Sequence, residues 1–369
     1  MTEKNDKPKR VLNRWAIALI VVILLVVISI FKIPSFKKER ALTKLGYSEE
    51  AITAIKKTHL TKTIIENDYY SDYLNQEIVK EDFKKERYKL YLYRPTLTED
   101  DFLLYDKLIA KGYTNDEVDN LYKELKFYEL TPLLVFDKIV DLDSYINDCK
   151  QNADNNSLAA FKLSKNYLYP YQNVKDAKNI GTETVLVSLK NELKDYKPSK
   201  LVPLGYQYAS EGVEIDNMAY EAFIALWQEM MDKDLPIYAL NGYRSYEDQA
   251  KIYNSYDNPK EADAQSIRPG FGESQTGLDL TVVDTRNEKL SNFGNTEEYK
   301  YLKENAHRFG FIIRYPENKS SITGYEFIPY QIRYVGKELA GKIYKSGLTY
   351  EEYFYLYLDS PVNEPTDKQ

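Results

Sequence analysis

The stretch "RPGFGESQTGLDLTV", residues 268–282, decides how the C-terminal half of this 369-residue chain can fold. A Pro-Gly pair opens it, a polar centre follows, and Gly277 leads into an apolar run that is typical of a strand. Upstream, residues 218–235 place apolar side chains on one face of a helix, and residues 236–253 indicate a strand, a Gly-Tyr turn and a second helix. The C-terminal half therefore mixes helices and strands.

Four segments of this half match one protein family in order and without large gaps. They are "GYRSYEDQAKIY" from Gly242, "RPGFGESQTGLDL" from Arg268, "NAHRFGFIIRYPENKSSITGY" from Asn305 and "PYQIRYVGKELA" from Pro329. Through them, the chain resembles the zinc D-alanyl-D-alanine carboxypeptidases of bacterial cell walls, which include the vancomycin-resistance type. The resemblance implies their fold over residues 180–358, which is α+β with an antiparallel sheet and packed helices.

The residues that carry the family's chemistry are replaced in this chain. The resemblance places Ser274 where the family has a zinc-binding His, and Thr281 where it has a zinc-binding Asp. It places Ile328 at the general-base Glu, and Gln331 at the third zinc ligand, a His. Hydroxyl and amide groups are weak ligands for zinc, and a site with neither ion nor base activates no water. We therefore expect no zinc, no other cofactor and no catalysis by the family mechanism.

A substitute metal site stays open at this stage. Glu273, Asp279 and Gln331 could line a polar pocket, because Asp279 and Thr281 share one face of the expected strand. Such a pocket contains no imidazole, so a hard cation such as calcium would suit it better than zinc. The alternative is that Asp279 is a solvated or hydrogen-bonded carboxylate.

The positions expected to bind a ligand remain polar. By resemblance, Arg244 helps to hold the terminal carboxylate of a peptide, and its place at the start of a helix adds attraction for that anion. The other residues expected to bind a ligand are Tyr243, Gln249, Gln275 and Thr276. We expect Arg314 and Arg333 to pair with carboxylates and to stabilise the fold.

Near the N-terminus, the run "WAIALIVVILLVVISIF" at residues 15–31 contains no charged side chain. A helix of this length spans about 25 Å, at the lower end of what crosses a bilayer. No small-residue cleavage site follows it, which favours an uncleaved anchor over a signal peptide. Five basic residues precede the run and four follow it closely, so we expect residues 1–14 in the cytoplasm, a transmembrane helix over 15–33 and the remaining chain outside the cell.

Residues 40–165 are rich in Lys, Glu, Leu and Tyr, and they contain two similar stretches. These are "LTKLGYSEEAITAI" from Leu42 and "LIAKGYTNDEVDNL" from Leu108. In each stretch a Gly-Tyr pair precedes a helix-capping Ser48 or Thr114, and apolar residues then recur at helical spacing. The pattern predicts an all-helical region of two repeat units, which acts either as a spacer or as a partner-binding array.

The composition excludes several other functions. The net charge is −7 and both signs are interleaved, which disfavours a nucleic-acid partner. The single cysteine, Cys149, rules out an intramolecular disulfide. The two histidines, His59 and His307, are too few for most catalytic zinc sites and lie far apart in the sequence.

Three functions remain open. The first is a membrane-anchored, extracellular and catalytically inactive carboxypeptidase-like protein that binds peptidoglycan stem peptides or a wall-associated partner. The second is an active peptidoglycan metallopeptidase with an altered site. The third is a scaffold that acts through the helical repeats. In each case residues 359–369 form a tail, and whether the chain is an enzyme stays open.

Overall fold

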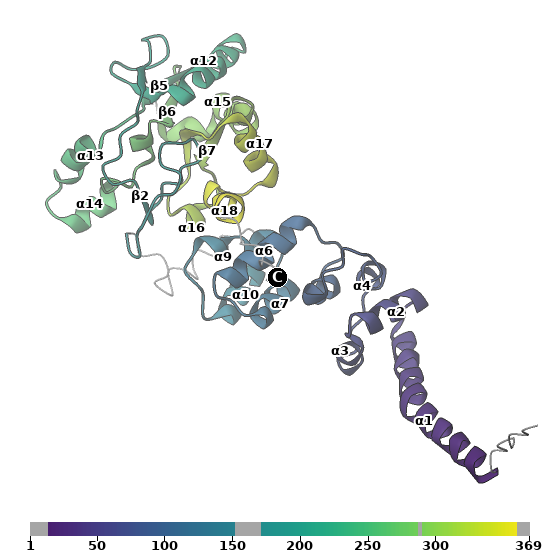
Figure 1. Cartoon of the computed structure of the whole chain (residues 1–369). Helices are drawn as coiled ribbons and strands as arrows, with labels where there is room; N and C mark the ends of the chain where they lie inside the picture. The colour runs from purple at the N-terminus through teal and green to yellow at the C-terminus, as the bar shows by residue number, and fades with distance from the viewer. Residues whose placement is uncertain (1–13, 152–170, 287–289, 360–369) are drawn as a thin grey trace, which may run out of the picture. The chain divides into compact units, whose positions relative to one another are not determined.

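The computed structural model describes residues 14–151, 171–286 and 290–359 (Figure 1). Contacts within the chain divide it into two compact units, Met1–Thr98 and Glu99–Gln369. The first unit is helical, whereas the second contains both helices and strands. The chain is therefore a mixed helix and sheet protein with an N-terminal helical region.

The boundary between the units differs from the predicted domain organisation. It lies inside the helical region predicted over 40–165, so the second half of that region packs with the α+β domain predicted over 180–358. The physical reason is a set of buried contacts, among them a hydrogen bond of 2.6 Å from Thr131 Oγ1 to Glu352 Oε1. The second Gly-Tyr stretch is consequently part of the same unit as the sheet.

The long helix α1 (Arg14–Leu45) runs through the transmembrane helix predicted over 15–33, where several side chains fall outside the described residues. Among the described residues, no helix is both long enough and apolar enough to cross a membrane, and the predicted anchor is not confirmed. The predicted segments 1–14 and 359–369 also lie outside the described residues, apart from one residue of each. The first unit also contains α2 (Glu49–Lys57), α3 (Thr61–Glu66), α4 (Asp72–Glu77), η1 (Lys85–Arg87) and α5 (Leu90–Tyr93).

Both Gly-Tyr stretches start a helix at the predicted residue. Ser48 caps α2 by accepting from the backbone N–H of Ala51, and Thr114 caps α7 by accepting from that of Glu117. Such caps satisfy backbone donors that a helix start otherwise leaves unpaired. The helices of residues 99–151 are α6 (Glu99–Ala110), α7 (Asn115–Glu124), α8 (Phe127–Leu130), α9 (Pro132–Val135) and α10 (Leu142–Gln151).

A four-stranded antiparallel sheet with strand order β5-β6-β8-β7 is the centre of the α+β part. Its strands are β5 (Ile237–Asn241), β6 (Asp279–Asp284), β7 (Phe311–Tyr315) and β8 (Ile328–Tyr334). Two small sheets accompany it, made of β1 (Lys175–Asp176) with β2 (Asn191–Glu192) and β3 (Leu201–Pro203) with β4 (Glu214–Asp216). The antiparallel sheet predicted for this domain is therefore present.

Helices and short turns connect these strands. The α-helices are α12 (Asn217–Asp232), α13 (Tyr246–Tyr253), α14 (Pro259–Gln265), α15 (Glu297–Asn305), α16 (Ser320–Thr323), α17 (Lys337–Ser346) and α18 (Tyr350–Tyr353). The shorter turns are η2 (Glu273–Thr276), η3 (Leu290–Asn295), η4 (Ala306–Phe309) and the π-turn η5 (Phe354–Leu358).

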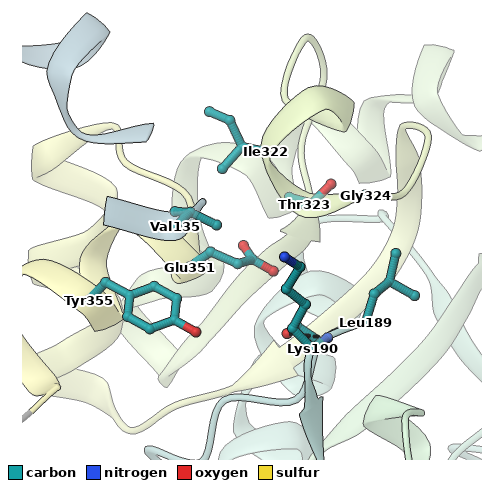
Figure 2. A pocket seen from close by; sticks show the side chains of 9 residues that line it. Val135, Leu189, Lys190, Ile322, Thr323, Gly324, Glu351 and Tyr355 are labelled. Atoms are coloured by element: carbon teal, nitrogen blue, oxygen red, sulfur yellow. Dashed lines mark hydrogen bonds between the residues drawn. The ribbon is translucent and has the colours of Figure 1, made fainter. Parts of the chain in front are cut away.

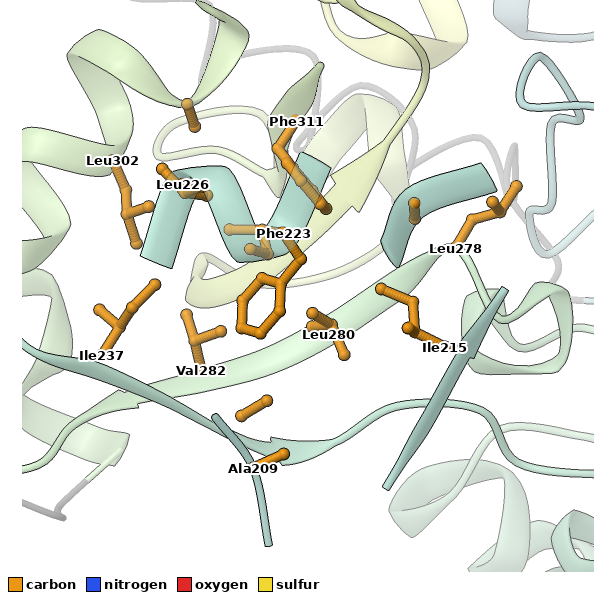
Figure 3. Packing of buried hydrophobic residues seen from close by; sticks show 14 of the residues in the cluster. Ala209, Ile215, Phe223, Leu226, Ile237, Leu278, Leu280, Val282, Leu302 and Phe311 are labelled. Atoms are coloured by element: carbon orange, nitrogen blue, oxygen red, sulfur yellow. The ribbon is translucent and has the colours of Figure 1, made fainter. Parts of the chain in front are cut away.

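The core lies where α12 packs on the central sheet (Figure 3). Phe223 and Leu226 of α12 are fully buried, as are Leu280 and Val282 of β6. The apolar face predicted for α12 is confirmed, although Trp227 stays half-buried and packs edge-on against Tyr208. This packing fixes β6, and with it the position of the loop that enters β6 from Pro269.

Candidate functional site

The turn η2 joins the quoted stretch to the sheet and presents its polar centre. Gly277 ends η2 with a φ of +70°, and a Cβ added there would lie 3.1 Å from the backbone nitrogen of Asp216. Only glycine adopts this conformation in such a close approach without strain. The chain then enters β6, where Thr281 lies directly opposite Gln331 of β8.

Three of the four replaced positions lie together around Asp279. The side-chain amide of Gln331 donates to Asp279 Oδ2 at 2.7 Å, and the hydroxyl of Ser274 lies 3.5 Å from the same oxygen. Thr281 is the register partner of Gln331. Ile328 begins β8, where its partner across the sheet is Tyr315. The resemblance therefore brought together residues from η2, β6 and β8 that are close in space.

Asp279 is the unusual group of this cluster because it is 2% exposed and lacks a full set of hydrogen bonds. Its Oδ1 atom is buried and has no partner among the described residues. Burial, together with the negative charge of Glu273, raises the pKa of Asp279 to about 7, against the lowering effect of the Gln331 hydrogen bond. The carboxyl group is therefore partly protonated near neutral pH.

Arg244 lies beside this cluster and is held by two contacts. Its backbone N–H donates to the carbonyl of Ser274 at 3.1 Å, and its guanidinium donates to Gln249 Oε1 at 3.0 Å. Gln249 is itself fixed by donating to Ser266 Oγ and to the Ile267 carbonyl. The predicted ligand residue Gln249 thus orients Arg244 through its own carbonyl oxygen, while its amide group is bound to the loop.

Two other predicted ligand residues have their polar groups engaged by the scaffold. Gln275 donates to the carbonyls of Lys194 and Tyr196 and accepts from the N–H of Gly270. Thr276 donates to the Glu273 carbonyl and accepts from the backbone N–H of Leu278. Both side chains are almost fully buried, so in this structure they shape the loop.

Tyr243 keeps a partly exposed side chain next to Arg244. Its backbone N–H donates to the Glu214 carbonyl, which fixes the residue at the start of the corner. Burial raises the pKa of the Tyr243 hydroxyl, so it remains a neutral hydrogen-bonding group. Of the predicted ligand residues, Tyr243 and Arg244 are therefore the two that remain partly exposed at the corner.

Four buried charged side chains form a connected group that includes Glu273, the first residue of η2. Glu273 accepts from Arg314 Nε at 2.6 Å and from a guanidinium N–H of Arg333, and Arg314 also donates to Glu351 at 2.6 Å. All four side chains are at most 2% exposed. The pairing expected for both arginines is confirmed, but sequence reasoning missed Glu351. Its signal was an acidic pair, "EE", inside the aromatic stretch that follows Thr349.

The donors at the replaced positions do not fit zinc. Ser274 offers a hydroxyl group, and Gln331 turns its amide nitrogen toward Asp279. Among the described residues, no group of three or more His, Cys, Asp or Glu side chains is placed to bind a metal. His307 stacks on Tyr344 at 3.9 Å instead. Weak neutral oxygen donors around one carboxyl group are a poor set for this ion.

The substitute pocket for a hard cation is also incomplete. Glu273 was expected to line it with Asp279 and Gln331, but both oxygens of Glu273 accept hydrogen bonds from arginines. One carboxyl group then remains, and Arg244 and Arg333 add positive charge near it. Calcium sites draw on several oxygen ligands and carboxylates, so this arrangement does not favour one.

Comparison with known proteins finds relatives that are named as carboxypeptidases. The family model described as "VanY: D-alanyl-D-alanine carboxypeptidase" matches residues 212–337. The putative carboxypeptidase YodJ of Bacillus subtilis (strain 168) is 33% identical over 220 residues, which cover 56% of this chain and 80% of that protein. A D-alanyl-D-alanine carboxypeptidase of Enterococcus faecalis (strain ATCC 700802 / V583) is 44% identical over 126 residues, which cover 34% of this chain and 42% of that protein.

Solved structures give similar matches. The LdcB LD-carboxypeptidase, whose structure concerns peptidoglycan recognition, is 34% identical with a TM-score of 0.47, over 50% of this chain and 90% of that chain. VanYB in complex with D-alanine-D-alanine is 32% identical with a TM-score of 0.40, over 47% of this chain and 97% of that chain.

Proposed function

Because this chain belongs to the VanY family of D-alanyl-D-alanine carboxypeptidases, we propose that its site binds cell-wall peptides without hydrolysing them. The observation that carries the proposal is that Ser274 and Gln331, at two of the positions that correspond to the family's metal ligands, are hydrogen-bonded to the neighbouring carboxyl group of Asp279. A partly protonated cluster offers hydrogen bonds to a peptide, but it is a poor site for zinc and for the activation of water. The protein is then a pseudoenzyme that keeps a peptide-binding corner.

The ligand in this proposal is a peptide with a free C-terminal carboxylate. Arg244 offers a planar fork of donors, of which one N–H is used by Gln249 among the described contacts. Arg244 directly precedes Ser245, the N-cap of α13, so the helix start adds attraction for an anion bound at this corner. The proposal draws further support from a relative, VanYB, which was solved in complex with D-alanine-D-alanine.

The proposal also places the site outside the cell, on a membrane anchor. Its support is the uncharged run of residues 15–31 and the basic residues that flank it. A wall-associated protein partner, bound through the helical region, is the other interaction that this placement would allow. Recovery of the full-length chain from cells in the fraction that remains soluble after membrane sedimentation would contradict the anchor.

Replacing Arg244 with alanine should weaken the binding of a stem peptide ending in D-Ala-D-Ala by about tenfold to a hundredfold. The reason is that one charge-assisted hydrogen-bonded pair contributes about 1.5–3 kcal/mol. Titration calorimetry on the purified protein measures the change. Arg308→Ala is the matched control, because it removes an arginine that is paired with Glu229 on the exposed surface.

Two outcomes would redirect the proposal. Equal affinities of the wild type and Arg244→Ala would show that Arg244 does not contact the ligand. An absence of binding by the wild type would favour the scaffold function of the helical repeats.

The purified protein should retain far less than one zinc ion per chain after incubation with zinc and gel filtration. The donors of Ser274, Thr281 and Gln331 are too weak to keep the ion during the separation. Elemental analysis by mass spectrometry gives the stoichiometry. One zinc ion per chain that is lost in Asp279→Ala would instead support an active metallopeptidase with an altered site.

A further inference from the structure

A pattern related to the two Gly-Tyr stretches of the helical region occurs inside the family domain. Residues 343–352, "IYKSGLTYEE", repeat the order of an apolar residue, a glycine four positions later, an apolar residue and a capping hydroxyl. In this third copy the apolar residue after Gly347 is Leu348 rather than tyrosine. The cap is Thr349, which starts α18 as Ser48 starts α2 and Thr114 starts α7.

The three copies share their backbone geometry and their burial. Gly46, Gly112 and Gly347 all have a positive φ, of +111°, +100° and +67°. The residue after each glycine is buried, and each cap residue accepts from the third N–H of the following helix. A glycine in this conformation followed by a hydroxyl cap ends one helix and starts the next at a fixed angle. The third stretch is therefore a structural copy of the first two.

In each of the first two copies, the tyrosine after the glycine forms a hydrogen bond with the backbone of a residue 22 to 26 positions later. In the first copy, Tyr47 Oη donates to the carbonyl of Tyr69, 22 positions along, at 2.9 Å. In the second, Tyr113 Oη accepts from the N–H of Ile139, 26 positions along, at 2.9 Å. In both copies this tyrosine therefore holds a later segment of the same copy in place through a hydrogen bond.

The third copy instead forms its buried hydrogen bond with a residue from the segment of the second copy. Glu352 completes a capping box with Thr349, and its other oxygen accepts from Thr131, which stands 221 positions earlier. Thr131 and Glu352 are both fully buried. Lys107 of α6 also donates to the Asp359 carbonyl at 2.5 Å, so a second contact joins the helical segment to the C-terminal segment.

We propose that helices α6–α10 are the docking partner of this third copy, and that their docking holds the candidate site in position. Helix α18 connects the helical segment to the candidate site, because its two neighbouring glutamates bind different partners. Glu352 bonds to Thr131 of the helical segment, whereas Glu351 bonds to Arg314, which bonds to Glu273 at the start of η2. The next residue of η2 is Ser274, whose carbonyl fixes the backbone of Arg244.

A small cavity beside Glu351 is lined by residues of both segments (Figure 2). It has a volume of about 30 Å³, which is room for one water molecule, and Val135 of α9 lines it together with Glu351 and Tyr355. The second oxygen of Glu351 is buried without a hydrogen-bond partner among the described residues. The bond from Arg314 therefore holds one oxygen of Glu351, and the other oxygen lies in the part of the domain where α9 and α18 meet.

The docking can be tested by cutting the chain between its partners. A protease site inserted within residues 152–170 allows the folded full-length chain to be cleaved, and gel filtration then reports whether the two fragments remain together. We expect them to co-elute in buffer and to separate only on denaturation. Fragments that separate at micromolar concentration without denaturant would overturn the proposed docking.

The support of the site can be tested in the uncut chain by hydrogen exchange. Thr131→Val removes the bond to Glu352 at nearly constant volume, and should speed amide exchange about tenfold or more in both α18 and η2. Thr114→Val is the matched control, since it removes the cap of the second copy and should affect α7 alone. Unchanged exchange in η2 of Thr131→Val would overturn the support of the site. Neither readout requires a ligand, so a failure of the proposed peptide binding is recognised separately.

Discussion

Replacing Glu273 with glutamine is expected to lower the free energy of unfolding by about 3–5 kcal/mol. Glutamine keeps the shape of the side chain but removes the charge that Arg314 and Arg333 share. Arg314 keeps Glu351, whereas Arg333 is left buried with only carbonyl partners. An uncompensated buried charge costs several kcal/mol because no water can replace the lost partner. Urea unfolding, followed by far-UV circular dichroism, measures the loss.

Glu298→Gln is the matched control for this substitution. Glu298 is as buried as Glu273, but its partner Arg286 is about half exposed and can be hydrated when the carboxylate is lost. We therefore expect a clearly smaller loss of stability in the control, of about 1 kcal/mol or less. Equal losses in the two variants would mean that the four buried charges act as separate pairs rather than as one stabilising group.

The sequence was most informative where its pattern repeats along one element. The face of α12 follows helical spacing, and the caps Ser48 and Thr114 stand just before their helices, so local chemistry was enough to place them. The pairing of Arg314 and Arg333 could also be anticipated, because an arginine in an apolar strand needs a carboxylate. The identity of the carboxylates could not, since Glu273 and Glu351 come from distant segments.

The candidate site was predictable in position and less so in the direction of its polar groups. Sequence shows that Gln275 is polar, but not that its amide reaches carbonyls about 80 residues earlier in the chain. The same holds for Gln249, which orients Arg244 instead of facing a ligand in this structure. Hydrogen-bond direction depends on the loops that surround a side chain, and no single-sequence pattern records it.

The domain boundary is a second case in which long-range contacts decided the outcome. Composition is uniform across residues 40–165, so the region read as one helical module. Residues from Glu99 onward belong to the unit that contains the sheet, and the buried bond from Thr131 to Glu352 is one of the contacts that join them. The third copy, which contains Glu352, was missed because Leu348 replaces the tyrosine of the pattern. A search for a glycine four positions after an apolar residue and followed by an apolar residue and a Ser or Thr, rather than for Gly-Tyr, would have found it.

Ionisation of Asp279 should make the fold less stable as the pH rises. In the folded chain its pKa is raised from 3.8 to about 7, so between these values the folded state holds a proton that the unfolded state has released. Raising the pH through this window therefore favours the unfolded state, and the full effect is on the order of 4 kcal/mol. Other carboxyl groups titrate in the same range, so the contribution of Asp279 must be isolated by difference.

Asp279→Asn provides that difference, because asparagine is neutral at every pH and can still accept from Gln331. The variant should gain stability relative to the wild type as the pH rises from about 4 to about 7, and the gain should level off above pH 8. Asp263→Asn is the control of opposite sign, since hydrogen bonds from Arg268 lower the pKa of Asp263 and its charge stabilises the fold above the ordinary pKa. Urea unfolding of the three proteins at several pH values yields both differences.

A difference between wild type and Asp279→Asn that stays constant from pH 4 to pH 8 would show that Asp279 is ionised normally. The cluster at the candidate site would then carry a full negative charge, which is the condition under which a cation, rather than a peptide carboxylate, becomes its natural ligand.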